Sequence, residues 1–168
     1  MTGGRQKEDA AMPCLFALAL CAMAPVLPAQ AKKHDPIVDI AKGKPEMAAA
    51  IRKARAGLPG FWQRAAAPGP GESYFLIKFD LVPGEVDEYI WAQVITRAGG
   101  ATTARLVNRP RAPGYAKGQE VQVTDAQVID WSYVKDDVRV MGAETTRALL
   151  AMVPPAEAAA LRRSHGWD

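Results

Sequence analysis

The sequence predicts an α+β domain with an N-terminal helix, a curled antiparallel sheet of about six short strands (a half-open barrel) and two C-terminal helices. Apolar residues recur at helical spacing after Pro45 and again near the C-terminus, whereas much of the stretch between residues 73 and 141 alternates between apolar and polar. Short turns rather than long crossovers join the alternating segments, which favours antiparallel pairing. Glycine and proline separate these segments at short intervals, as in small curled sheets.

The first helix is expected to begin at Pro45, because proline suits the first turn of a helix. Its apolar side is formed by Met47, Ala50, Ile51, Ala54 and Leu58. Gly57 and Pro59-Gly60 are expected to end the helix near Leu58. The following pair, Phe61-Trp62, is expected to pack the end of the helix onto the sheet.

The β region is expected to contain strands at residues 74–81, 88–97, 102–107, 120–124, 131–134 and 138–141. Ala98-Gly99-Gly100 and Lys135-Asp136-Asp137 predict hairpin turns. Thr124 and Gln127 have the spacing of a capping box for one helical turn. Helices at 143–152 and 155–163 are expected to follow, with the break between them at Pro154-Pro155.

The N-terminal residues 1–31 are interpreted as a cleavable secretory signal. After a short basic start, residues 12–27 are almost wholly apolar, and Ala29-Gln30-Ala31 places small residues where a signal peptidase cleaves. The apolar run is shorter than the roughly 20 residues of a membrane-spanning helix. We therefore expect cleavage near Ala31, a periplasmic or secreted mature protein and no stable membrane anchor. The true start is Met1 or Met12, and either start exports the chain.

The mature chain is expected to comprise a flexible lead at 32–44 and a single domain at 45–168. The two cysteines, Cys14 and Cys21, both lie in the signal, so the mature domain has no disulfide and no thiol chemistry. The net charge is +3 at pH 7, from 21 basic and 18 acidic residues. This mild basicity does not require a nucleic-acid or membrane partner, and export argues against nucleic acid.

A series of short motifs resembles a known family. The motifs are Glu46-Met47-x-x-Ala50-Ile51, Leu58-Pro59-x-Phe61-Trp62, Glu88-x-Ile90-Trp91, Asn108-x-Pro110, Gly118-x-x-Val121-x-Val123, Asp130-Trp131-x-Tyr133 and Gly142-x-x-Thr145-x-Arg147. Their order and spacing resemble the YegJ-like bacterial domain of unknown function through nearly the whole mature chain. The resemblance implies a fold but no activity. Family members often carry acidic residues where this chain has Val107 and Arg109, so any binding by this loop is expected to favour an anion.

The first candidate binding site is Asp130, Trp131 and Tyr133. An indole and a phenol beside a carboxylate are able to bind a ligand. The alternative is structural: Trp131 and Tyr133 plug the sheet, and Asp130 caps a turn by accepting backbone N–H bonds.

The second candidate site is the loop that follows the third predicted strand, with Arg109, Arg111, Tyr115 and Lys117. Arg105 and Asn108 belong to the same candidate site, and cations around an aromatic ring favour phosphate, nucleic acid or an anionic polymer. The alternative is a solvated loop with no ligand.

Catalytic and metal-binding patterns are weak. His34 and His165 have no second ligand at metal-binding spacing, so neither a metal nor a cofactor is expected. Turn carboxylates such as Glu85, Asp87 and Glu88 are expected to be solvated. We therefore predict a non-enzymatic module that binds an envelope protein or an anionic envelope component. The alternatives are a small hydrolase that uses turn carboxylates, and an inhibitor or immunity-like module.

Overall fold

This computed structural model describes residues 43–84 and 88–168. The predicted signal peptide and most of the predicted lead lie outside the described residues. Within those ranges the elements occur in the predicted order. They are α2 (Pro45–Ala66), β1 (Glu72–Asp80), β2 (Tyr89–Ala98), β3 (Ala101–Leu106), β4 (Glu120–Thr124), the 3-10 helix η1 (Asp125–Gln127), β5 (Val128–Lys135), β6 (Arg139–Gly142), α3 (Glu144–Leu149) and α4 (Pro155–Ser164).

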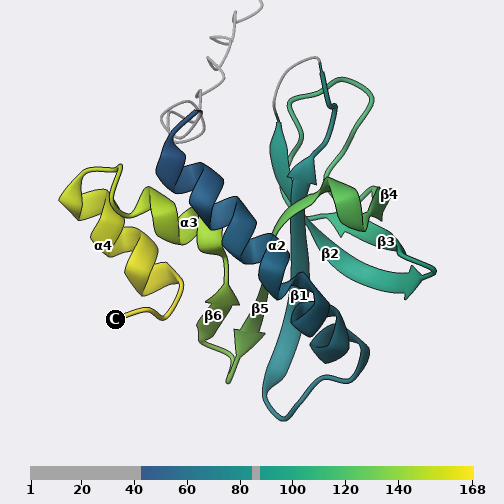
Figure 1. Ribbon diagram of the computed structural model, residues 1–168, viewed down its shortest axis with the longest axis horizontal. Helices are drawn as coiled ribbons and strands as arrows, with labels where there is room; N and C mark the ends of the chain where they lie inside the picture. Colours follow the sequence, from purple (N-terminus) through teal and green to yellow (C-terminus); the bar gives the residue numbers. More distant parts are fainter. Residues whose placement is uncertain (1–42, 85–87) are drawn as a thin grey trace, which may run out of the picture. The chain divides into compact units, whose positions relative to one another are not determined.

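The strands form one sheet in the order β4-β3-β2-β1-β5-β6. Every neighbouring pair is antiparallel. The sheet does not close on itself, so β4 and β6 are its two edges. Figure 1 shows α2 crossing one face of the sheet, with α3 and α4 beside its β6 end. The predicted α+β class and the open antiparallel sheet are therefore confirmed.

The side chains of the sheet divide between an inner face, which packs against α2, and an outer face. Ile77 on β1 lies opposite Trp131 on β5, and both face inward. The next row of the sheet, Lys78 opposite Trp91 and Asp130, therefore faces outward. The inner face forms most of the core together with the buried side of α2, which consists of Ala50, Ala54, Leu58 and Phe61.

Helix α2 is longer than predicted, because it continues through Gly57 and Pro59. The predicted end near Leu58 is therefore wrong. Trp131 explains why: its indole Nε1 donates to the backbone oxygen of Ala54 at 2.8 Å, and a Cβ atom at Gly57 would lie 2.8 Å from the indole ring. The glycine makes room for the ring, and this docking onto the sheet outweighs the hydrogen bond that the proline removes.

The last turns of α2 carry the aromatic pair that anchors the helix to the sheet. The ring centroid of Phe61 lies 5.3 Å from that of Trp131 and 5.9 Å from that of Phe75. The guanidinium carbon of Arg97 lies 4.3 Å from the ring centroid of Trp62. The predicted packing of this pair onto the sheet is confirmed, although both residues lie inside the helix rather than after it.

The C-terminal tail contacts β6. The backbone N–H of Val140 donates to the oxygen of His165 at 2.9 Å, and the indole of Trp167 donates to the oxygen of Val140 at 2.6 Å. Arg147 stacks its guanidinium carbon 3.8 Å from the Trp167 ring centroid and donates to the oxygen of Val140 at 3.3 Å. These contacts occupy backbone groups of β6 that would otherwise be open to pairing with another chain.

Candidate functional site

Asp130 occupies an outward position of β5, yet its side chain is fully buried. Its Oδ1 accepts hydrogen bonds from the backbone N–H groups of Trp131 at 2.8 Å and Glu144 at 3.1 Å. Its Oδ2 accepts from the backbone N–H of Thr145 at 2.7 Å and from the Thr145 hydroxyl at 2.6 Å. The carboxylate therefore satisfies free N–H groups at the start of α3 and ties that helix to the sheet.

Lys78, which is half-buried, extends this chain of polar groups. Its Nζ donates to the Thr145 hydroxyl oxygen at 3.2 Å. Burial raises the pKa of Asp130, against the opposing effects of the Thr145 hydrogen bonds and the Lys78 charge. A hydroxyl between an amine and a carboxylate has the composition of an activated nucleophile. However, Thr145 is only 1% exposed and its hydroxyl donates to the carboxylate, so these contacts support a structural role.

The other two residues of the first candidate site face the core. The ring centroid of Trp131 lies 5.3 Å from that of Phe61, and the ring centroid of Tyr133 lies 5.4 Å from that of Phe75. Asp130 lies on the opposite face of the sheet. The structure therefore does not bring the three side chains together around a ligand, and their internal contacts support the structural alternative.

The second candidate site, residues 108–118, is called the basic loop below. Glu88, immediately before β2, holds this loop with both carboxylate oxygens. Oε1 accepts from the backbone N–H of Arg111 at 2.6 Å, and Oε2 accepts from that of Ala112 at 2.8 Å. Because the loop covers it, Glu88 is only 7% exposed. The expectation that Glu88 is a solvated turn carboxylate is wrong.

The root of the basic loop is held by β2 and β3. The side-chain oxygen of Asn108 accepts from the backbone N–H of Trp91 at 3.3 Å. The backbone N–H of Val107 donates to the oxygen of Trp91 at 3.1 Å, and that of Gly118 donates to the oxygen of Leu106 at 2.8 Å. With the Glu88 contacts, these bonds fix the loop backbone near both ends and at Arg111.

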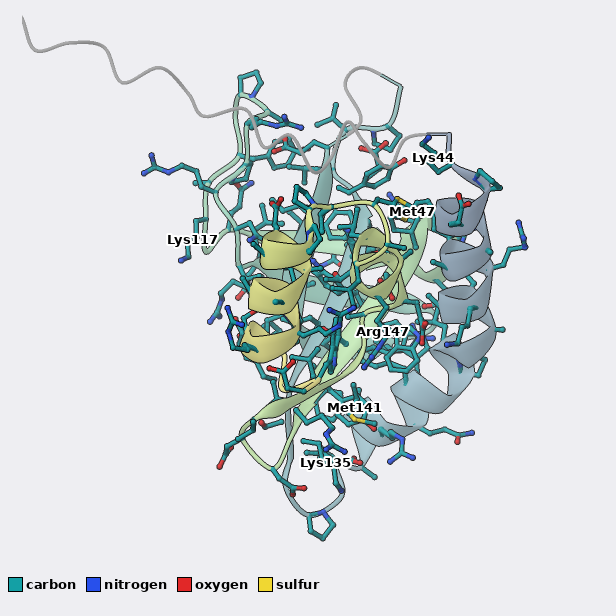
Figure 2. The ribbon with its side chains drawn as sticks, turned by 90° about the vertical axis from the view of Figure 1, so that its left-hand side faces the viewer. Lys44, Met47, Lys117, Lys135, Met141 and Arg147 are labelled. Atoms are coloured by element: carbon teal, nitrogen blue, oxygen red, sulfur yellow. The ribbon has the colours of Figure 1, made fainter. Side chains whose placement is uncertain are left out.

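The predicted binding residues of the basic loop are all exposed: Arg109, Arg111, Tyr115 and Lys117. Within the part of the chain that the structure describes, Arg109 and Lys117 form no hydrogen bond or ion pair. Arg111 places its Nε 3.8 Å from Glu88 Oε1. Figure 2 shows Lys117 pointing away from the domain on the side of the sheet opposite α2. The structure thus presents cations on an anchored backbone.

Three other features were considered: a metal site, a membrane-spanning helix and a surface hollow. Within residues 43–84 and 88–168, no group of three or more His, Cys, Asp or Glu side chains lies close enough to hold a metal ion. No helix in those ranges is long and apolar enough to cross a membrane. An open hollow of about 630 Å³ lies between the β5–β6 hairpin and the C-terminus. Its charged lining is mixed in sign, with Lys135, Asp136, Arg139, Arg163 and Asp168.

Comparison with known proteins places the domain in a family. The model of a family described as an uncharacterized protein conserved in bacteria (DUF2314) matches residues 44–168. The chain belongs to this family. The searches of curated proteins and of solved structures found no match. The expected bacterial domain of unknown function is thereby confirmed, whereas the YegJ-like name stays a prediction. Because the DUF2314 family carries no established activity, function has to be argued from the site.

Proposed function

We propose that this domain is a non-enzymatic binding module that acts in the periplasm or outside the cell, with the basic loop as its binding surface. Its partner is a negatively charged component of the cell envelope. The observation that carries this proposal is the buried Glu88 carboxylate, which holds the backbone N–H groups of Arg111 and Ala112 at 2.6 and 2.8 Å. The buried carboxylate fixes the backbone of the positively charged loop, while the side chains of the loop stay exposed to solvent.

An anchored loop binds at a lower entropic cost than a mobile one, because its backbone is already ordered before the partner arrives. Arg109 and Lys117 have no partner among the described residues, so pairing with a ligand does not break an internal ion pair. Arg105, next to the loop in sequence, differs in this respect, because it pairs with Glu120 at 2.8 Å. The mild overall charge of +3 means that attraction is local to the loop rather than spread over the domain.

The test uses the full chain produced in a bacterial host. The intact mass of protein from the envelope fraction is measured, and cross-linked partners are identified in the same sample. We expect a chain that begins near Lys32 and a recurring partner. The variant Arg109→Glu/Lys117→Glu should lose this partner. Arg162→Glu/Arg163→Glu at the end of α4 changes the charge equally on exposed residues and should keep it.

Three outcomes would contradict the proposal, and they affect different parts of it. A full-length mass in the cytosolic fraction would overturn export. Equal partner recovery by both double variants would show that the loop is not the binding surface. A partner that proves to be a protein without an acidic surface would contradict the assigned charge complementarity.

A further inference from the structure

The outer face of β2, β3 and β4 carries a strip of aromatic and uncharged polar side chains. On β2, Tyr89, Trp91 and Gln93 follow one another at every second position and share this face. Tyr89 is 39% exposed. Gln93 lies opposite Arg105 on β3, which extends the strip to the next strand. An aromatic platform beside an amide side chain offers both an apolar surface and hydrogen-bonding groups.

The far end of the strip is formed by β3 and β4. Gln122 donates from its side-chain nitrogen to the Thr103 hydroxyl at 2.8 Å, and Arg105 pairs with Glu120 at 2.8 Å. This end is therefore electrically neutral, with its one cation already paired. It displays amide and hydroxyl groups that both donate and accept hydrogen bonds.

The near end of the strip adjoins the basic loop. Trp91 is bonded through its backbone to Asn108 at 3.3 Å, and Tyr89 directly follows Glu88, which holds the middle of the loop. Lys117 points from the loop on the side of the sheet opposite α2, which is the side of the outer face (Figure 2). Lys78 on β1 adds a further cation beside the strip, with its Nζ 5.6 Å from the Trp91 ring centroid. The surface therefore combines a cationic end with a strip of aromatic and polar side chains whose far end is neutral.

The combination of a cationic loop and an aromatic, polar strip fits some classes of anionic ligand better than others. Single-stranded nucleic acid carries a phosphate at every nucleotide and is held by cations along its whole path. The strip has one cation near Trp91, which is Lys78, and its far end carries a paired arginine and the carboxylate of Glu120. A membrane surface is held by apolar side chains inserted beneath a cationic face, which a polar strip does not provide. An acidic polysaccharide matches both parts, because its sugar rings present C–H surfaces and hydroxyl groups between its charged groups.

We propose that the ligand is an acidic polysaccharide. Its sugar rings lie on the strip formed by Tyr89, Trp91, Gln93, Thr103 and Gln122, and its anionic groups pair with Arg109 and Lys117. This inference rests on the proposed function and narrows the chemical class of the partner. It also extends the binding surface from the loop to the outer face of β2, β3 and β4.

The test is an equilibrium titration of the full chain with defined polymers at one ionic strength. Hyaluronan and polygalacturonate are the acidic glycans. Polyglutamate supplies charge without sugar, dextran supplies sugar without charge, and oligo(dT) supplies phosphate with aromatic bases. We expect both acidic glycans, compared per charge, to bind at least about tenfold more tightly than polyglutamate, and dextran to bind more weakly than either glycan.

Variants separate the two halves of the surface. Tyr89→Ala and Gln122→Ala change side chains of the strip and keep the loop cations. Each should weaken glycan binding by about threefold to tenfold while leaving polyglutamate binding unchanged. Arg109→Ala/Lys117→Ala should weaken binding of every polyanion and reduce its salt dependence. Arg162→Ala/Arg163→Ala is the matched control and should bind as the unaltered chain does. Thermal unfolding of each variant establishes that the fold is intact.

The outcomes distinguish this inference from the proposed function. If polyglutamate or oligo(dT) binds as tightly as the glycans, or if the strip variants have no effect, the acidic-glycan assignment is wrong and the cationic loop alone explains binding. If no acidic glycan binds but a protein partner is cross-linked through the loop, the inference fails and the binding module stands. If no polymer binds and no partner depends on the loop, both fail.

Discussion

Asp130 offers the sharpest test of how this fold is held, through the substitution Asp130→Asn. The carboxylate accepts four hydrogen bonds, from Trp131 N–H and Glu144 N–H on Oδ1 and from Thr145 N–H and its hydroxyl on Oδ2. Asparagine keeps one oxygen and replaces the other with an N–H₂ donor.

The cost of the substitution follows from the better of its two orientations. With the amide nitrogen at the Oδ2 position, the Thr145 hydroxyl rotates to accept a hydrogen bond, but the Thr145 backbone N–H loses its acceptor. With the nitrogen at the Oδ1 position, two backbone N–H groups lose theirs. One buried, unpaired N–H group costs about 1–3 kcal/mol. We therefore expect Asp130→Asn to lower the free energy of unfolding by about that amount at neutral pH.

The pH dependence gives a second, sign-specific prediction. Burial raises the pKa of Asp130 above its ordinary value of 3.8. A carboxyl with a raised pKa in the folded state contributes stability that is fully present below pH 3.8 and is lost as pH rises through the folded-state pKa. The stability difference between the unaltered chain and Asp130→Asn should therefore be larger in acid than at neutral pH.

The assay is urea unfolding of both chains at several pH values from about 3.5 to about 8, so that other titrating groups cancel in the difference. Asp125→Asn is the matched control, because Asp125 forms a more exposed ion pair with Arg97 at 2.7 Å and should lose less than about 1 kcal/mol. A difference that is constant or grows with rising pH would refute the argument from desolvation. An Asp130→Asn chain as stable as the unaltered one would show that the carboxylate does not hold α3.

Three further predictions concern single contacts. Gly57→Ala should lower the free energy of unfolding by about 1–3 kcal/mol, because the new methyl group clashes with Trp131. In a chain that already carries Trp131→Ala, the same substitution should be nearly neutral. If chemical unfolding shows that the effects of the two substitutions add, the clash is not the cause. Glu88→Gln leaves one loop N–H unpaired, so hydrogen exchange at Arg111 or Ala112 should accelerate while exchange in the β5–β6 hairpin stays unchanged; protection as in the unaltered chain would contradict the anchor. Arg147→Lys removes the guanidinium contacts with Trp167 and β6, so exchange at Val140 should accelerate; an unchanged rate would show that Arg147 does not hold the tail.

Local signals in the sequence predicted most of the fold. Strict alternation located β1, and β4 was located at its observed bounds. The Lys135-Asp136-Asp137 turn forms the expected hairpin, with positive φ angles of 51° and 57° at the two aspartates. The end of α2 could not be predicted locally, because the indole that docks at Gly57 comes from distant β5. Helix α3 ends at Leu149 rather than at the predicted residue 152. Its first turn is capped by Asp130 of β5 rather than by a neighbouring side chain, which local signals could not predict.

The candidate site was predicted only in part. The loop cations were identified by residue type, whereas the role of Glu88 was missed. A signal was present: Glu88 stands at an alternate position with Ile90 and Ala92, so the period of the strand places it on the inner face. What could not be read was the pairing of its oxygens with loop N–H groups 23 and 24 residues away. Thr145 and Lys78 were missed because their relation to Asp130 arises only when strands pair.

The backbone path of the basic loop and the charge of its side chains are set by different contacts. Glu88 holds backbone N–H groups, and Asn108 accepts from the backbone of Trp91, so neither contact depends on the side chain at position 109. Position 111 differs, because the Arg111 side chain also pairs with Glu88 at 3.8 Å. Substitutions at position 109 therefore alter the charge of the surface without altering the path of the loop. In this domain the side chains at positions 109 and 111 are positively charged. The same scaffold with acidic residues at 107 and 109 would keep its loop geometry and lose its attraction for anions.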